Sequence, residues 1–213
     1  RGYYEDPLQP SRYARLAWER QPNGGFAWYD YDAEGRVVAE AEAWKDVDIP
    51  ILESNAVVAN AKVTLSSFAP VDSADDGTAR PRNPRTITQM AAGTIVAKTY
   101  YAYIVGPKGE VSEIKEECSS PTATYGDAGN RRTRTVYYSD NEALWPGEIK
   151  STEYPDGRLD RHLYERGSYS RGNVAFPGRF VVGTGDFVRI TTIHGTTNRQ
   201  EGTSTTTREV VVR

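Results

Sequence analysis

Hydrophobic and polar residues alternate with a period of two along much of this chain, most clearly over 186–193 and 205–212. This period is typical of β-strands, because successive side chains point to opposite faces of a sheet. Segment 37–44 contains good helix formers, yet its small apolar residues alternate with acids, which again favours a strand. The pattern therefore predicts an all-β fold.

Turn signals divide the strands into pairs. Three turns share one form, in which glycine follows proline by two positions, at 22–24, 107–109 and 155–157. Proline fixes φ near −65° and glycine accepts the positive φ that follows. The turns join strands predicted at 16–20 and 26–31, 98–104 and 111–115, and 148–154 and 158–164. A fourth turn, at 32–35, continues the second strand into 37–38, so the sequence predicts consecutive antiparallel hairpins.

Further strands are predicted at 61–67, 85–90, 133–138, 186–193 and 205–212. Stretches rich in Gly, Pro, Ser and Asp predict loop insertions near 72–84, 119–130 and 169–185. Because no change in composition marks a linker, we expect a single β array over 1–213. The first residues, Arg-Gly-Tyr-Tyr, and the last, Val-Val-Val-Arg, suggest a fragment of a much longer chain.

Composition narrows the choice of partners. The chain has 14 Tyr, 4 Trp and 5 Phe, and tyrosine in such supply favours half-buried pleated surfaces. With 26 basic and 29 acidic residues the net charge is −3, which argues against a nucleic-acid partner. No apolar run approaches the roughly 20 residues that span a bilayer, so membrane insertion is not expected. The single cysteine, Cys118, allows no intrachain disulfide.

One motif carries a family resemblance. Residues 24–37 contain a glycine, an aromatic-x-Tyr-Asp element, two free positions and Gly-Arg-hydrophobic; the matching residues are Gly24, Tyr29, Tyr31, Asp32, Gly35, Arg36 and Val37. This segment resembles the YD repeat of RHS-type proteins. A shorter copy at 153–159 keeps Tyr154, Asp156, Gly157 and Arg158. A third, at 103–111, keeps the hairpin but lacks the Asp and Arg.

Physical chemistry gives each motif residue a role. The aspartate accepts hydrogen bonds from backbone N–H groups further along the turn, and glycine adopts the conformation that other residues resist. The tyrosine ring packs against the next hairpin with its hydroxyl at the wet edge, and the arginine covers that ring and pairs with a carboxylate. Because a lone hairpin is marginally stable, such units persist only in rows.

The resemblance implies a long sheet that spirals into a shell. In bacterial RHS proteins and toxin complexes the shell encloses a toxic cargo, and in teneurin-like proteins it is an extracellular adhesion module. We therefore expect a structural wall segment of a large bacterial protein, secreted or at the cell surface. Its expected partners are neighbouring repeats, adjacent copies through open sheet edges, and an enclosed effector. The Asp-Pro-x-Gly run of the family's self-cleaving element is absent from the sequence.

Two other functions stay open. A carbohydrate-binding or adhesion module would use Trp18 and Trp28 as a platform for glycans, whereas cross-strand packing inside the sheet would bury them. Only one of the two faces of strand 26–31 is expected to be packed. A polysaccharide-acting β-fold enzyme would need two carboxylates about 5–10 Å apart. Without a serine elbow or a phosphate loop, neither an enzyme nor a cofactor is expected.

The sequence predicts no metal site. His162 and His194 have no Cys, Asp or second His at ligand spacing, and we assign them surface or packing roles. The acids within 72–77 offer oxygens for Ca²⁺, but their spacing does not fit an EF-hand and favours a solvated loop. Cys118 follows two glutamates, whose charges are expected to raise its pKa, so it is interpreted as a structural thiol.

Overall fold

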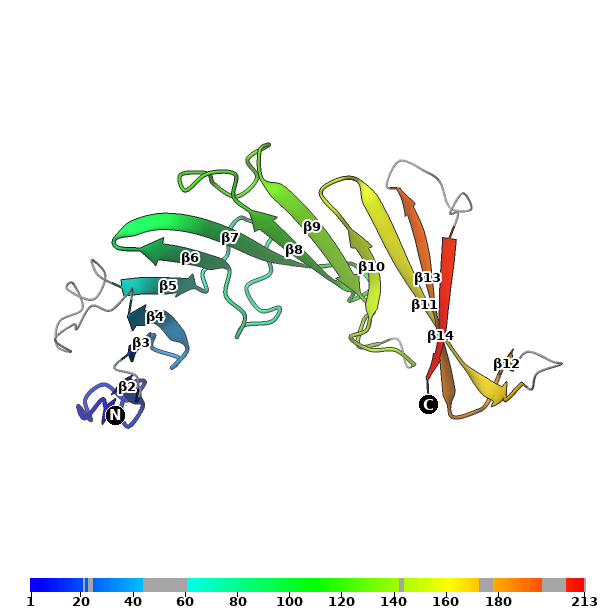
Figure 1. The fold of residues 1–213 in the computed structure, drawn as a ribbon, viewed down its shortest axis with the longest axis horizontal. Helices are drawn as coiled ribbons and strands as arrows, with labels where there is room; N and C mark the ends of the chain where they lie inside the picture. The colour runs from blue at the N-terminus through cyan, green and yellow to red at the C-terminus, as the bar shows by residue number, and fades with distance from the viewer. Residues whose placement is uncertain are drawn as a thin grey trace. The chain divides into compact units, whose positions relative to one another are not determined.

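The computed structural model describes residues 1–20, 22, 25–43, 61–141, 144–172, 178–196 and 206–212. Over these residues the chain forms strands and no helix, which confirms the all-β prediction (Figure 1). The strands are β1 (Gly2–Tyr3), β2 (Leu16–Arg20), β3 (Phe26–Tyr31), β4 (Val37–Ala43), β5 (Ala61–Ser67), β6 (Thr86–Ala91), β7 (Thr94–Val105), β8 (Val111–Glu117), β9 (Arg131–Tyr137), β10 (Ile149–Glu153), β11 (Arg158–Ser170), β12 (Arg179–Val182), β13 (Phe187–Thr196) and β14 (Thr206–Val212). No helix in the described ranges has the length and apolar character needed to cross a membrane.

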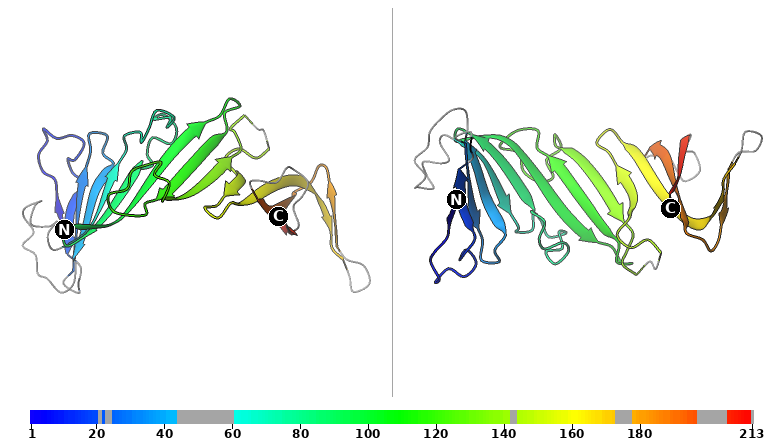
Figure 2. Two further views of the ribbon diagram at one scale, coloured as in Figure 1. Left: turned by 90° about the horizontal axis from the view of Figure 1, so that it is seen from above. Right: turned by 60° about the horizontal axis from the view of Figure 1, so that its bottom comes forward.

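The strands are hydrogen-bonded in chain order. From β1 to β11 each strand pairs with its neighbours in the sequence, and the order continues through β13 and β14, while β12 pairs with β11 outside this path. The pairing is antiparallel, as in β3 with β4 and β4 with β5 (Figure 2). The predicted consecutive hairpins are therefore confirmed.

Residue contacts divide the chain into two compact units, one of 1–103 with 115–131 and one of 104–114 with 132–213. In the first unit, one row of side chains crosses five strands, because Trp18, Trp28, Ala41, Val63 and Met90 face one another in register. Ala41 and Val63 are almost fully buried in this row. They belong to an apolar cluster that also contains Phe26, Ala61, Trp28 and Met90.

Both faces of β3 are packed, so the expectation of a single packed face was wrong. On the face opposite Trp28, Tyr31 is 9% exposed. The N-terminal segment covers it: the ring of Tyr4 makes an edge contact 6.1 Å from the Tyr31 ring, and the Arg15 guanidinium lies 5.3 Å from it. The hydroxyl of Tyr4 also donates to the carbonyl of Tyr29 at 2.7 Å. This second layer is built by residues that carry no regular alternation.

The loops predicted near 72–84 and 119–130 lie between β5 and β6 and between β8 and β9. The prediction of a loop over 169–185 was wrong in part, because this stretch contains β12, which pairs with the last residues of β11. Gly167 pairs with both Val182 of β12 and Phe187 of β13. A Cβ atom at Gly167 would meet the carbonyl oxygen of Val181, so glycine is needed where these strands meet.

A tight turn between β6 and β7 was missed by the sequence reasoning. Ala91 pairs with Thr94, which leaves a loop of two residues, Ala92 and Gly93. Both have positive φ, 47° and 77°, which is the geometry of a type I′ turn. Asn-Gly is the usual sequence signal for this turn. Because alanine occupies its first position here, the sequence carries no such signal.

Asparagine tolerates the left-handed conformation better than alanine does, so Ala92→Asn is expected to raise the free energy of unfolding by about 0.5–1 kcal/mol. Gly93→Ala is expected to lower it by about 1 kcal/mol, although nothing lies within 4 Å of the added carbon. Urea unfolding monitored by fluorescence measures both. Equal stabilities of the two variants would show that this turn does not have the assigned geometry.

Candidate functional site

The turn motif of residues 24–37 is closed by one carboxylate. Asp32 Oδ1 accepts hydrogen bonds from the backbone N–H groups of Glu34 and Arg36, at 3.0 and 2.8 Å. Its Oδ2 accepts from Arg36 Nε at 2.6 Å, which makes an ion pair. Gly35 has a φ of 75°, the conformation for which the turn needs glycine. These are the contacts expected of the aspartate and the glycine.

The same backbone arrangement occurs at three turns. The residue before the turn donates its N–H to the carbonyl four positions on, and the glycine three positions on donates back to it. The glycines, Gly35, Gly109 and Gly157, have φ values of 75°, 82° and 80°. This is a type I turn followed by a left-handed glycine, a common three-residue hairpin connection. The three sequence copies thus share one turn geometry, including the copy without Asp and Arg.

The arginines of the copies at 24–37 and 153–159 stack on aromatic rings in different ways. Arg158 lies 3.9 Å from the centre of the Tyr154 ring of its own turn, as expected. Arg36 instead lies 4.1 Å from the ring of Phe68, which follows β5, and its Nη1 donates to the carbonyl of Pro81. The Tyr31 ring is therefore not covered by Arg36, and its hydroxyl donates to the carbonyl of Leu16 at 3.0 Å rather than lying at the wet edge.

The remaining predicted residues fall into three groups. Gly24 lies outside the described residues. Asp156 accepts one hydrogen bond, from the backbone N–H of Arg158. The turn at 155–157 therefore has fewer carboxylate contacts than the turn at 32–35. Trp18 and Trp28 face each other across β2 and β3 and are half-buried. Trp18 also packs against Gly2, where a Cβ would meet its indole ring, so the geometry favours cross-strand packing for both tryptophans.

The surroundings of Asp32 shift its pKa. Its partial burial would raise the pKa, but hydrogen bonds from the backbone and side chain of Arg36, the positive charge of Arg36 and the N–H of Glu34 outweigh it. The pKa of Asp32 is therefore lower than the ordinary value for an aspartate. The folded chain holds this carboxylate in its charged form.

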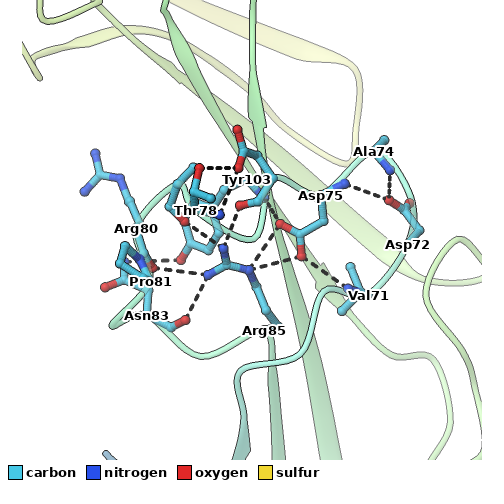
Figure 3. Close-up of polar contacts among 12 residues, drawn as sticks. Val71, Asp72, Ala74, Asp75, Thr78, Arg80, Pro81, Asn83, Arg85 and Tyr103 are labelled. Atoms are coloured by element: carbon cyan, nitrogen blue, oxygen red, sulfur yellow. Dashed lines mark hydrogen bonds and ion pairs between the residues drawn. The ribbon is translucent and has the colours of Figure 1, made fainter. Parts of the chain in front are cut away.

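The sequence reasoning missed a buried ion pair in the loop of residues 68–85, here called the Arg85 loop. Figure 3 shows the Arg85 guanidinium enclosed by the loop, with the Asp75 carboxylate beside it. Arg85 is 1% exposed and Asp75 is 7% exposed. The expectation of a solvated acidic loop was wrong for Asp75, because a cation supplied by the chain itself pairs with it.

Every N–H of the Arg85 side chain has a protein acceptor. Its Nε lies 3.1 Å from both oxygens of Asp75. Its two terminal nitrogens donate to four backbone carbonyls of the loop, those of Asp76, Ala79, Arg80 and Asn83. A guanidinium has five N–H donors, so the loop satisfies it completely. Pairing and complete hydrogen bonding offset the free-energy cost of taking a charge out of water.

The same pair ties the loop to β7. Asp75 Oδ1 accepts the backbone N–H of Tyr103 at 3.0 Å, and the guanidinium lies 4.4 Å from the centre of the Tyr103 ring. The backbone N–H of Asp76 donates to the carbonyl of Tyr103 at 2.8 Å. Through the carbonyl of Pro81 the loop also contacts Arg36, which follows the turn at 32–35. The Arg85 loop is thus a brace between the turn at 32–35 and the end of β7.

Histidines and the cysteine were expected to be structural, and their contacts are now visible. His194 Nδ1 lies 2.7 Å from Asp160 Oδ1 across β11 and β13, and His162 Nδ1 lies 3.2 Å from Thr192 Oγ1. Burial raises the pKa of Cys118, in the predicted direction. The charges of Glu116 and Asp127 raise it further, and the charge of Lys98 lowers it. Within the part of the chain that the structure describes, no three His, Cys, Asp or Glu side chains are grouped to hold a metal ion.

Comparison with known proteins found no match to this chain among protein-family models, curated proteins or solved structures. The class is therefore defined by the fold alone, as an all-β protein of consecutive antiparallel hairpins. Within that fold, the three hairpin turns and the Arg85 loop are held by side-chain and backbone hydrogen bonds that the strand pattern alone does not provide.

Removing one partner of the buried pair is expected to be costly. Asp75→Ala leaves the guanidinium of Arg85 buried without its anion, and the free energy of unfolding should fall by about 3–5 kcal/mol. Arg85→Lys should also destabilise, because an ammonium has only three donors for the loop carbonyls. The matched control is Glu117→Ala, which breaks the half-exposed pair with Lys115 and should cost about 0–1 kcal/mol. Similar losses for the buried and exposed pairs in chemical unfolding would contradict the brace.

The lowered pKa of Asp32 makes part of the stability dependent on pH. A carboxyl with a lower pKa in the folded than in the unfolded state stabilises the fold above the unfolded value, about pH 4, and that contribution disappears as the pH falls through the folded pKa. Asp32→Asn should therefore cost about 1–2 kcal/mol at pH 7, with the difference from wild type shrinking below about pH 4. The control Asp156→Asn, with one hydrogen bond, should cost less at pH 7. A pH-independent difference for Asp32→Asn would refute this role.

Proposed function

We propose that this chain is a structural wall segment of a large RHS-type shell protein, secreted or at the bacterial cell surface, which encloses cargo or mediates surface contact. The observation that carries the proposal is the agreement between strand order and chain order along the sheet. A sheet built in this way can be extended by adding further hairpins at its edge. A wall needs that property, whereas a closed globular domain does not.

The repeated turn supports the same proposal. Three hairpins separated by long stretches of sequence have the same pair of backbone hydrogen bonds and the same left-handed glycine. A recurring unit of this kind is what a repeat architecture requires, because each hairpin is stabilised by its neighbours. The resemblance of residues 24–37 to the YD repeat gives the proposal its family.

Exposed apolar side chains on the strands fit a surface that meets other protein. Val37, Leu65, Val96, Val105 and Leu163 are each at least 38% exposed and lie on different strands or at separate places along them. Single exposed apolar residues are ordinary. Here such residues occur on β4, β5, β7 and β11, so each of the two units has some of them. In the proposed shell they would face neighbouring repeats or cargo.

The proposal has a direct test at the sheet edge. Among the described strands, β14 pairs on one side only, with β13. The isolated chain is therefore expected to associate as its concentration rises, because the free side of β14 presents unpaired N–H and C=O groups. Light scattering and sedimentation velocity measure this association.

Two proline variants supply the control. In an antiparallel strand, alternate residues direct their N–H toward one neighbour or the other, so Thr207→Pro and Arg208→Pro remove donors on opposite sides of β14. One variant should stay monomeric with an unchanged melting temperature, and the other should lose stability. A wild-type chain that remains monomeric and melts sharply at every concentration would overturn the proposal.

A further inference from the structure

A pocket of about 390 Å³ lies at the N-terminal segment, and none of its lining residues belongs to the turn motifs or the Arg85 loop. Its lining residues are Tyr3, Tyr4, Glu5, Tyr13 and Ala14. The pocket is wide open to solvent, its lining is mostly apolar, and its volume falls within the range of small-molecule sites. The proposed wall function does not require such a pocket.

Two paired backbone segments build the pocket. Tyr3 of β1 pairs with Leu16 of β2. Beyond β1, the N–H of Tyr4 donates to the carbonyl of Arg15 at 3.0 Å, and the N–H of Ala14 donates to the carbonyl of Tyr4 at 2.9 Å. Residues 3–5 and 13–14 are therefore adjacent through backbone hydrogen bonds. The pocket is part of the fold rather than a gap between unconnected loops.

One wall of the pocket is conformationally strained. Ala14 has a φ of 59°, in the left-handed region that non-glycine residues rarely adopt. Its hydrogen bond to Tyr4 and the bond from the Arg15 N–H to the Arg12 carbonyl hold it there. Ala92, in the turn between β6 and β7, has a similar φ of 47°, so this conformation belongs to a tight turn and here fixes the shape of one pocket wall.

The tyrosines divide into a fixed wall and two open rings. Tyr4 is fixed by its hydrogen bond to the carbonyl of Tyr29 and by its ring contact with Tyr31. Tyr3 and Tyr13 are each 53% exposed, so these large rings contribute little to the core. Arg12 lies 5.8 Å from the Tyr4 ring, but its charge is paired with Asp30 at 2.9 Å.

Among the described residues that line the pocket, Glu5 carries the charge, and its carboxylate disfavours an anionic ligand. The faces of tyrosine rings carry negative electrostatic potential and attract cations, as Arg12 beside the Tyr4 ring illustrates, and Tyr3 and Tyr13 supply the exposed rings. A compact, strongly hydrated ammonium loses much hydration on entering such a site, whereas an alkylated ammonium also gains apolar contact. We propose that the pocket formed by Tyr3, Tyr4, Tyr13 and Glu5 binds a quaternary ammonium group.

Choline and 3,3-dimethylbutan-1-ol have the same shape and differ in charge, so the pair isolates the cationic contribution. Titration of the full chain, followed by NMR shifts or calorimetry, should show choline binding at least tenfold more tightly than the neutral alcohol. Tyr13→Ala and Glu5→Gln should each weaken choline binding about fivefold or more, and Tyr13→Phe should retain it. The control is Leu8→Ala, because Leu8 is 88% exposed and does not line the pocket. This variant should bind choline with the affinity of the wild-type chain.

The quaternary ammonium group could belong to a lipid head group or to a modified protein, and two further titrations distinguish these sources. Phosphatidylcholine vesicles test a lipid head group, and a peptide with trimethyl-lysine tests a modified protein. Equal affinity for choline and its neutral analogue would overturn the proposal and leave an apolar groove. Preferential binding of methyl glucoside would identify a sugar site instead, and no binding of choline at about 50 mM would also overturn it. The comparison of ligands uses the wild-type chain, so a variant that fails to fold does not affect its result.

Discussion

Hydrogen bonding between neighbouring strands is the interaction on which the rest of this structure depends. A hairpin of two strands is marginal in water, so each hairpin here is stabilised by the strands that pair with it on either side. Because sheet order follows chain order, the partner of nearly every strand is the next segment of the sequence. Short turns can therefore set the register of long strands. The pair of backbone hydrogen bonds at Gly35, Gly109 and Gly157 fixes that register at three places.

Apolar burial and polar contacts both hold this fold together. The apolar cluster of the first unit gathers around Ala41 and Val63 on one face of β4 and β5, and Ala102 and Ile114 are buried outside it. Polar and aromatic contacts add to this burial. Arg85 satisfies all its donors within one loop, and Arg36 joins its own turn to Phe68 and Pro81. Buried polar groups of this kind contribute modest net stability but require one arrangement, so they favour a unique packing of the hairpins.

The sequence predicted what is local and missed what is not. The bounds of β2, β3 and β5 agree with the predicted strands, because alternation and Pro-x-Gly signals report directly on backbone geometry. The contact of Arg85 with Asp75 was not predictable, since the loop that surrounds the guanidinium gives no periodic signal. His194 and Asp160 lie 34 positions apart and meet only through the register of β11 and β13. The N-terminal cover of Tyr31 was missed for the same reason, because it depends on how an irregular segment returns to the sheet.

Amide hydrogen exchange of the dilute chain tests most directly whether strand pairing holds the structure. Strand pairing on both sides predicts slow exchange at successive residues along β3 to β11, extending well beyond the apolar cluster. It also predicts that the amide of Tyr103, which donates to the buried Asp75 carboxylate, is among the slowest. Protection confined to the strands around Val63, with rates typical of an unfolded chain elsewhere, would contradict it.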